Sequence, residues 1–225
     1  MWNRFTARRR ILPSPKNNAM KIERFVLGPV QTNTYLVYDE NSNTGVVIDP
    51  AVYDSGMIKA INDRGLQIKY ILITHGHFDH VTGLSKLKEQ IPVSICIHPA
   101  DLAIMPKDEK GIVNQIGFSF EAFQPDIELR DNQKIDVGDL KFSVIHTPGH
   151  TPGCVCFYLA NEKVLFSGDT LFQSAIGRTD FPLGSEDQIM ASIINKLFTL
   201  PEAVIVYPGH GEKTTIEQEK THFTA

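Results

Sequence analysis

Short apolar runs that end in a polar loop recur along the chain from residue 20 onward. Four of them are followed within three residues by a histidine or an aspartate: residues 70–74 before His75, residues 142–145 before His146, residues 164–166 before the Ser-Gly-Asp of 167–169, and residues 203–207 before the Pro-Gly-His of 208–210. Short runs of β-branched and aromatic residues are typical of buried strands. Polar residues just beyond such strands are expected to gather along one edge of the sheets.

Amphipathic spacing predicts three helices among these strands. Ser185 opens a capping box, and Ile189 and Ile193 lie on one stripe of the helix that follows. A second helix is expected over residues 54–65, and a third over residues 81–90. Because strands lie on both sides of these helices in sequence, the pattern predicts an α/β protein in which a sandwich of sheets is flanked by helices.

Composition narrows the class of protein. The chain has 225 residues, of which 42% are hydrophobic and 21% charged, and it holds no apolar run of the roughly 18 to 20 residues that cross a membrane. We therefore expect a globular protein with no membrane partner. The three cysteines, Cys96, Cys154 and Cys156, are an odd number without a framework, which indicates reduced thiols and a cytoplasmic location.

Charge is distributed unevenly along the chain. The net charge is -4, yet residues 1–19 contain arginines and a lysine without any acidic residue, so the remainder is more acidic than this average. Such a body is a poor surface for a phosphate backbone, and nucleic acid is excluded as an expected partner. Residues 1–19 are predicted to be a disordered basic extension outside the fold, and residues 20–225 one domain. An organelle-targeting presequence has a similar composition and is the alternative.

The chemistry is concentrated in the segment His75-Gly76-His77-Phe78-Asp79-His80. Its three imidazoles and one carboxylate supply nitrogen and oxygen donors that divalent metals accept. His75 and His77, two apart on an extended turn, point the same way and can share one ion. Asp79 and His80, adjacent at a helix start, can turn toward a second ion. Packing gives no reason for this cluster, so the segment predicts a metal site.

One segment cannot saturate two metals, so further ligands are expected at the other strand ends. The candidates are His150, Asp169 and His210, which stand beside glycine or proline residues that let the backbone turn tightly. His146 either hydrogen-bonds within the loop that leads to His150 or is an ordinary loop residue. We expect two divalent ions, with zinc foremost and iron or manganese as alternatives.

The order of these residues resembles the metallo-β-lactamase superfamily, and Gln31-Thr32-Asn33-Thr34-Tyr35 and Val46-Val47-Ile48-Asp49-Pro50 look like its opening strands. The resemblance implies an αβ/βα four-layer sandwich of two mixed β-sheets flanked by helices. It also implies the ligands of each ion: His75, His77 and His150 on the first, Asp79, His80 and His210 on the second, and Asp169 bridging both. Asp49 matches an acid that orients a ligand imidazole.

Within the superfamily, residues 177–181 and 208–211 resemble the short, single-domain branch of the glyoxalase II-like (hydroxyacylglutathione hydrolase-like) group. This implies cleavage of a thioester of the S-lactoylglutathione type by a hydroxide held between two ions, with Asp79 orienting it. The expected substrate is a small-molecule thioester or glutathione conjugate, and the expected protein a monomer or homodimer. Zinc β-lactamases replace the bridging aspartate, so Asp169 argues against antibiotic hydrolysis. Arg178 either pairs with a substrate carboxylate or forms a salt bridge with Asp180.

Another reaction class shares part of the pattern. Residues 153–157 and 177–181 also resemble persulfide dioxygenases, which bind one iron through the equivalents of His75, His150 and Asp169. Those enzymes usually carry a Pro-Ala-His-Asp-Tyr type sequence where this chain has Pro-Gly-His-Gly, which favours the hydrolase. A lactone or phosphodiester hydrolase on the same site is a third alternative.

Overall fold

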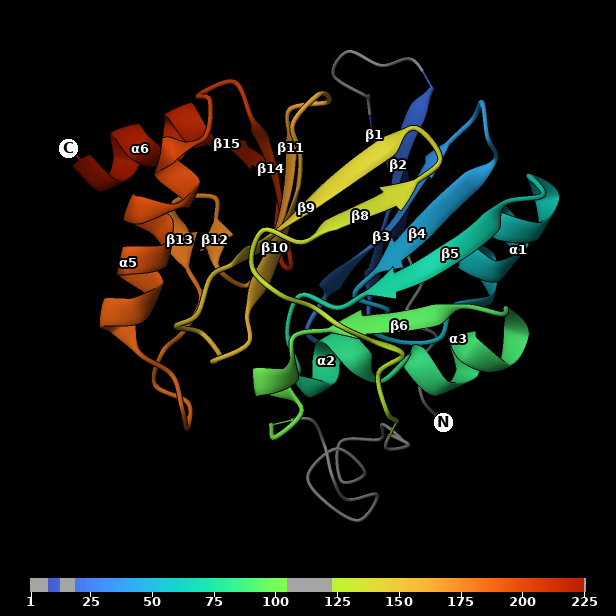
Figure 1. Ribbon diagram of the computed structural model, residues 1–225, viewed down its shortest axis with the longest axis horizontal. Coiled ribbons are helices and arrows are strands. Elements are labelled where there is room, and N and C mark those ends of the chain that lie inside the picture. Colours follow the sequence, from blue (N-terminus) through green and yellow to red (C-terminus); the bar gives the residue numbers. More distant parts are fainter. Residues whose placement is uncertain (1–7, 13–18, 105–122, 225) are drawn as a thin grey trace.

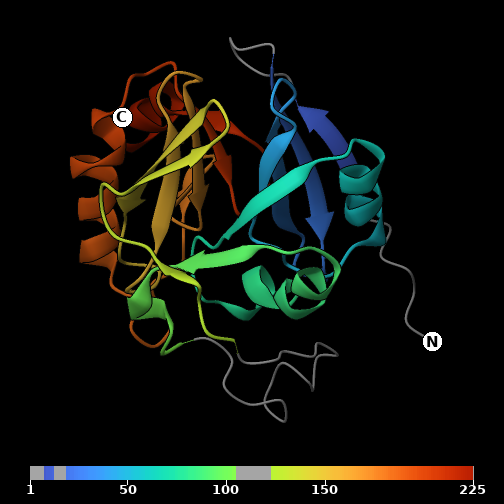
Figure 2. The ribbon, with the colours of Figure 1, turned by 45° about the vertical axis from the view of Figure 1, so that its right-hand side comes forward.

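The computed structural model describes residues 8–12, 19–104 and 123–224. In these residues two β-sheets face each other and helices cover their outer faces, as two views show (Figure 1, Figure 2). Both sheets are mixed, with parallel and antiparallel neighbours. The predicted αβ/βα four-layer sandwich is therefore confirmed.

The first sheet contains seven strands paired in sequence order. Neighbours from β1 to β4 are antiparallel, whereas neighbours from β4 to β7 are parallel. The strands are β1 (Arg8–Leu12), β2 (Met20–Leu27), β3 (Thr32–Asp39), β4 (Thr44–Ile48), β5 (Gln67–Leu72), β6 (Ser94–Ile97) and β7 (Ile127–Glu128).

The second sheet contains six strands in the order β15-β14-β11-β10-β9-β8, and its β11 and β14 are parallel. Between β11 and β14 in the sequence, β12 and β13 form a separate two-stranded antiparallel sheet. The strands are β8 (Lys134–Val137), β9 (Leu140–His146), β10 (Val155–Leu159), β11 (Val164–Gly168), β12 (Leu171–Phe172), β13 (Ala175–Ile176), β14 (Ile205–Pro208) and β15 (Thr214–Thr215).

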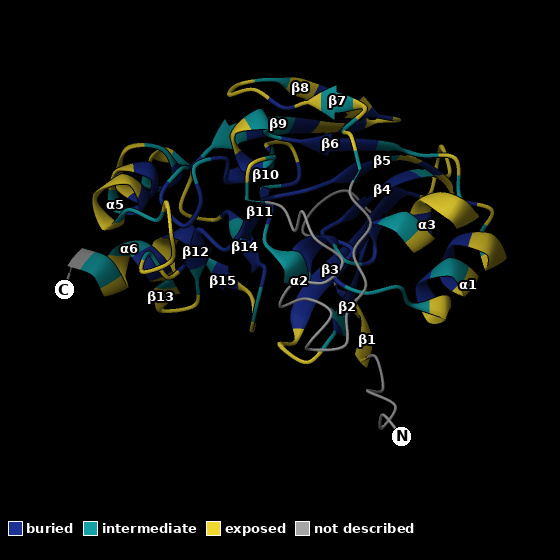
Figure 3. Cartoon of the chain, turned by 90° about the horizontal axis from the view of Figure 1, so that it is seen from below, coloured by how far each residue is buried: buried dark blue, intermediate teal, exposed yellow. Residues whose placement is uncertain are grey.

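Two of the helices begin at a side chain that caps them. Asp54 accepts a hydrogen bond from Met57 N at the start of α1 (Ser55–Asp63), and Ser185 caps α5 (Glu186–Asn195). α1 and α3 pack on the first sheet and α5 and α6 on the second, with their outward faces exposed (Figure 3). The other helices are α2 (Phe78–Val81), α3 (Leu84–Gln90), α6 (Ile216–Thr224) and the 3₁₀ turns η1 (Pro99–Asp101) and η2 (Leu197–Thr199).

Three apolar layers stabilise the sandwich. Between the sheets, Phe142 and Phe166 pack in one cluster with Ile22, and all three are buried. Ile61 of α1 and Ile193 of α5 belong to the layers under the helices. Burying a side chain of this size contributes about 1.5–3 kcal/mol, so these layers fix how the two sheets lie against each other.

The polar strand ends meet at one edge of the sandwich. Backbone hydrogen bonds join them: Thr74 O accepts from Val155 N at 2.9 Å, Gly168 O from Gly209 N at 2.8 Å, and Gly209 O from Asn33 N at 2.7 Å. Two of these bonds cross from one sheet to the other. The expected gathering of polar loops at one edge is therefore confirmed.

The N-terminal prediction is wrong for part of the extension. Arg8–Leu12 forms β1 and pairs antiparallel with β2, from Arg8 opposite Val26 to Leu12 opposite Ile22. β2 pairs with β3 along one edge, and β1 pairs with its other edge. Alternation of side chains along β1 places Leu12 in the core. Residues 1–7 and 13–18 lie outside the described residues.

The helix expected over residues 81–90 begins later than predicted, as α3 at Leu84, and Val81 is the last residue of the separate helix α2. Gly83 N donates to Pro50 O at 2.9 Å, and a Cβ at Gly83 would lie 2.5 Å from that oxygen. Close approach of the β4 loop therefore breaks the helix. Among the described residues no helix is both long and apolar enough to cross a membrane. The three cysteines are buried and free, as expected.

Candidate metal centre

The His75–His80 segment leaves β5, enters α2 and is tied at both ends to Asp49. Thr74 donates to this carboxylate through its backbone N at 2.7 Å and its Oγ1 at 2.6 Å. His80 Nδ1 donates to Asp49 Oδ2 at 2.9 Å. The expectation that Asp49 orients a ligand imidazole agrees with this contact, because the bond leaves His80 Nε2 facing the centre.

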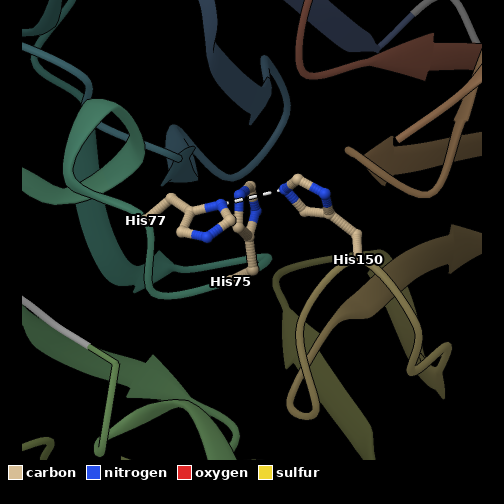
Figure 4. A group of neighbouring side chains, drawn as sticks. All are labelled: His75, His77 and His150. Atoms are coloured by element: carbon tan, nitrogen blue, oxygen red, sulfur yellow. Dashed lines mark hydrogen bonds between the residues drawn. The ribbon is translucent and has the colours of Figure 1, made fainter. Parts of the chain in front are cut away.

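His75, His77 and His150 form the first group of potential ligands. Figure 4 shows the three rings turned toward one another, two from the loop after β5 and one from the loop after β9. Their nitrogens lie within 4.8 Å of one another, and His77 Nδ1 is 2.9 Å from His150 Nε2. Two nitrogens on one tetrahedral zinc ion would be about 3.3 Å apart. The spacing is therefore close to what a shared ion requires.

Asp79, His80 and His210 form the second group, again with donor atoms within 4.8 Å of one another. Asp79 Oδ2 lies 3.2 Å from His210 Nε2 and 3.5 Å from His80 Nε2. Thr32 Oγ1 donates to the same Oδ2 at 3.0 Å. The hydroxyl of β3 therefore holds the carboxylate of α2 in a defined orientation.

Asp169 contacts members of both groups. Its Oδ1 lies 3.4 Å from His80 Nε2, and its Oδ2 lies 3.6 Å from His150 Nε2 and 3.6 Å from His210 Nε2. A carboxylate in this position can reach two ions at once. The structure thus brings together all seven residues that the sequence analysis selects as metal ligands.

Hydrogen bonds on the outer side of the rings determine which nitrogen faces the centre. His150 Nδ1 donates to Arg178 O at 2.7 Å, and His210 Nδ1 donates to Val30 O at 3.2 Å. A carbonyl oxygen only accepts, so the proton of each neutral ring lies on Nδ1 and the Nε2 lone pair faces inward. These carbonyls prepare both imidazoles as metal ligands.

Three buried polar atoms of the centre have no hydrogen-bond partner among the described residues: His75 Nε2, His80 Nε2 and Asp169 Oδ1. The last two lie 3.4 Å apart but do not form a hydrogen bond with each other. An unsatisfied buried polar atom costs about 1–3 kcal/mol, and here three belong to one cluster. Their donor set of imidazole nitrogen and carboxylate oxygen suits zinc, iron and manganese. The residues present therefore fit divalent metal ions.

Burial and charge adapt the imidazoles to this role. Burial lowers the pKa of His75 well below its usual range, and burial together with neighbouring imidazoles lowers the pKa of His77 to about 4. Both rings are therefore neutral near pH 7, as metal binding requires. Burial also lowers the pKa of His80, but the surrounding carboxylates, Asp79 foremost, outweigh it and raise the pKa to about 10. The second group thus lies where negative charge attracts a cation.

Two further residues selected from the sequence lie around the centre rather than in it. His146 Nε2 donates to Pro152 O at 2.9 Å, and its ring stacks on His98 at 4.2 Å between centroids. It therefore braces the loop that carries His150. Arg178 forms the alternative salt bridge, with Nη2 2.7 Å from Asp180 Oδ2. Its guanidinium also lies 4.1 Å from the centroid of the Phe181 ring.

Asp101 is a buried residue that the sequence analysis does not single out. It accepts from Gly76 N at 2.8 Å in the first ligand loop, and from Thr151 Oγ1 at 2.7 Å and Gly153 N at 2.5 Å in the loop of His150. One carboxylate therefore joins two loops that are remote in sequence. It follows Pro99-Ala100, where nothing local marks a buried acid.

A cavity of about 650 Å³ opens over the centre. Ligands of both groups form its base, and its walls include Val30, Ile104, Phe172, Ile176 and Phe181. These walls are mainly apolar, so the cavity can take an uncharged part of an organic substrate and hold it against the metal ligands.

Residues 27–210 match the model of the Metallo-beta-lactamase superfamily. The chain therefore belongs to the metallo-β-lactamase superfamily. It is 36% identical over 203 residues to hydroxyacylglutathione hydrolase GloC of Haemophilus influenzae, covering 89% of this chain and 95% of that protein. It is 32% identical over 224 residues to the mitochondrial persulfide dioxygenase ETHE1 of Homo sapiens, covering 96% and 80%.

Solved structures show the same fold. The BLEG-1 B3 metallo-beta-lactamase superposes with a TM-score of 0.82 at 36% identity, over 89% of this chain and 97% of that chain. TTHA1623 in a di-iron-bound form superposes with a TM-score of 0.76 at 35% identity, over 87% and 95%. Proteins similar to this chain thus have names that denote different activities, so the fold alone does not determine which reaction the site catalyses.

Proposed function

We propose that this superfamily enzyme is a binuclear hydrolase that cleaves a thioester of the S-lactoylglutathione type. The observation that carries the proposal is the completeness of the second ligand group, Asp79, His80 and His210, beside the first. A second ion needs this group, whereas a single ion does not. The similarity to GloC along nearly the whole of that protein supports the same class.

Two divalent ions, zinc foremost and iron or manganese as alternatives, would supply a water of lowered pKa and an electrophile for the carbonyl oxygen. The residues of the chain hold and orient the reactants. Asp79 is the proposed catalytic residue, because its carboxylate lies in the second group and faces the cavity. Because Thr32 fixes Oδ2, Asp79 can accept a hydrogen bond from the attacking water. This orients a lone pair of the water oxygen toward the thioester carbon.

The apolar walls of the cavity suit the uncharged parts of such a thioester. Phe172 and Phe181 stand on these walls, next to His210 and His77 respectively. Water is displaced from this surface on binding, which strengthens polar contacts near the scissile bond. The departing thiolate is a good leaving group, so cleavage requires no separate acid.

A persulfide dioxygenase is the second candidate. His75, His150 and Asp169 are the three positions that such an enzyme would use, and His150 Nε2 lies 3.6 Å from Asp169 Oδ2. The similarity to ETHE1 favours this candidate. It differs from the hydrolase in one consequence: His210 would not be needed for the reaction.

The discriminating experiment measures two reactions in the same preparations. Thiol release from S-lactoylglutathione and oxygen uptake with glutathione persulfide are followed in the wild type, in His210→Ala and in His222→Ala, a control that removes an exposed histidine of α6 that belongs to neither ligand group. We expect thioester cleavage that is lost in His210→Ala and kept in His222→Ala. Oxygen uptake that survives His210→Ala, without thioester cleavage, would make the protein a dioxygenase.

A further inference from the structure

A second cavity, of about 590 Å³, adjoins the metal centre and is strongly basic. Arg8, Arg9, Arg10 and Arg24 line it, against a single carboxylate, Glu212. His210 and Val30 line both this cavity and the apolar one over the centre. A ligand can therefore extend from the metal ligands past these two residues into the basic cavity.

Strand register places the arginines on one face. In the β1–β2 pair, Leu12 lies opposite Ile22 in the core between the sheets, and Arg10 lies opposite Arg24. Side chains alternate along a strand, so Arg10 shares the inward face with Leu12. Arg8, two residues further along, lies on this face as well. The inward face of β1 thus changes from apolar to cationic as the strand nears the His210 loop.

The charges of this face are only partly compensated. Arg9, which alternation places on the opposite face of β1, pairs with the buried Glu23 at 2.7 Å and is compensated there. Arg24 donates through Nη1 to Gly211 O at 2.9 Å and through Nη2 to Glu212 Oε1 at 2.8 Å. Arg8 and Arg10 have no ion pair with any residue in the described segments.

Arg24 gives a second indication, in addition to the charges of Arg8 and Arg10, that the cavity is built to bind an anion. It is 7% exposed, and its buried Nε has no hydrogen-bond partner in the part of the chain that the structure describes. Like charges directly opposite each other on neighbouring strands are destabilising, as Arg10 and Arg24 are here. An anionic ligand would reverse this repulsion and complete the charge balance of the cavity.

We propose that this cavity, formed by Arg8, Arg10 and Arg24 beside His210, binds the anionic end of the substrate. The groups that fit are carboxylates or phosphates, whose oxygens accept the forked donors of arginine. Assigning this ligand to a substrate rests on the proposed function. The site itself does not, because it can be occupied by the thiol product alone.

The test measures binding of the thiols without turnover. Isothermal titration calorimetry of the full chain with glutathione, which carries carboxylates, and with coenzyme A, which carries phosphates, compares the wild type with Arg10→Gln and Arg8→Gln. Arg130→Gln, an exposed arginine on a remote loop, is the control for loss of one charge. We expect at least one thiol to bind, with a dissociation constant raised about tenfold by Arg10→Gln and unchanged by Arg130→Gln. The thiol that responds identifies the anionic group.

Arginines on β1 have an ordinary alternative role, because charged residues on an edge strand prevent pairing with other chains. Equal affinities in the wild type and both β1 variants, or binding of neither thiol, would overturn the proposal and leave that role. Melting curves show whether the variants fold. If Arg10→Gln unfolds, Arg8→Gln decides alone, since Arg8 lies opposite Val26 and faces no like charge. Failure to cleave thioesters would count against the proposed function but would leave the binding result standing.

Discussion

The two halves of the metal centre are held in place by different means. The His75–His80 segment is fixed by buried carboxylates, because Asp49 binds its two ends and Asp101 binds its middle. The later ligands stand singly in loops that depend on glycine. A Cβ at Gly209 would overlap Asp169 Oδ1, and a Cβ at Gly149 would overlap the backbone of Ile189. One half therefore depends on hydrogen bonds and charge, and the other on space.

The difference also explains how readily the ligands of each half can be recognised in the amino-acid sequence. A compact motif concentrates its donors in sequence, whereas single ligands need tight turns that bring remote loops together. Substitutions around the His75–His80 segment should therefore impair the centre by removing hydrogen bonds and charge. Substitutions around the later ligands should impair it by steric overlap.

The largest effect is expected from Gly209→Ala. The added methyl would overlap Asp169 Oδ1 and lie 2.8 Å from His80 Cε1, so both residues must move. A displacement of about 1 Å in such a site costs roughly 100-fold in rate. Gly211→Ala in the same loop is the matched control, because nothing lies within 4 Å of its Cβ and only its left-handed backbone is strained. Steady-state kinetics and metal analysis check this; equal activity of the two variants would show that space does not limit this half.

Asp49→Asn should have the next largest effect. Asparagine offers one oxygen to three donors, from Thr74 N, Thr74 Oγ1 and His80 Nδ1. We expect metal affinity to fall about 10- to 100-fold, as for other groups that orient a metal-bound histidine. Competition with a chelator measures this affinity. Unchanged affinity would mean that Asp49 does not orient the second group.

Asp101→Asn should have a smaller effect on metal binding, because Asp101 contacts loop backbone and Thr151 rather than a ligand ring. The lost or mismatched hydrogen bonds are expected to destabilise the fold by about 1–3 kcal/mol. Urea unfolding measures this free energy, with chelator competition on the same samples. A loss of metal affinity as large as that of Asp49→Asn would place Asp101 in the same role as Asp49.

The smallest effect is expected from Arg178→Gln. Its guanidinium is exposed and already engaged by Asp180 and Phe181, and exposed ion pairs contribute little to stability. We expect kcat/KM for the thioester to change less than about threefold, without a change in melting temperature. A fall of tenfold or more, with KM raised, would instead assign Arg178 to the substrate carboxylate.

Much of the fold and centre could be predicted from the sequence, for physical reasons. Apolar runs followed by histidine or aspartate indicated where strands end. The His75–His80 segment could be recognised as a metal-binding motif without knowledge of the tertiary structure. The pairing of β1 with β2 could not be predicted, because arginines at Arg8, Arg9 and Arg10 indicate exposure rather than an edge strand. Asp101 was equally hidden, since its three donors come from two loops remote in sequence. The cytoplasmic location and the oligomeric state stay predictions.

In the proposed binuclear hydrolase, both ligand groups hold an ion. The most direct test is the metal content per chain, by elemental analysis, of protein loaded in turn with zinc, iron or manganese and freed of excess metal. We expect about two equivalents in the wild type and about one in His210→Ala, since His75, His77 and His150 are left intact. One equivalent in both proteins would contradict a binuclear centre.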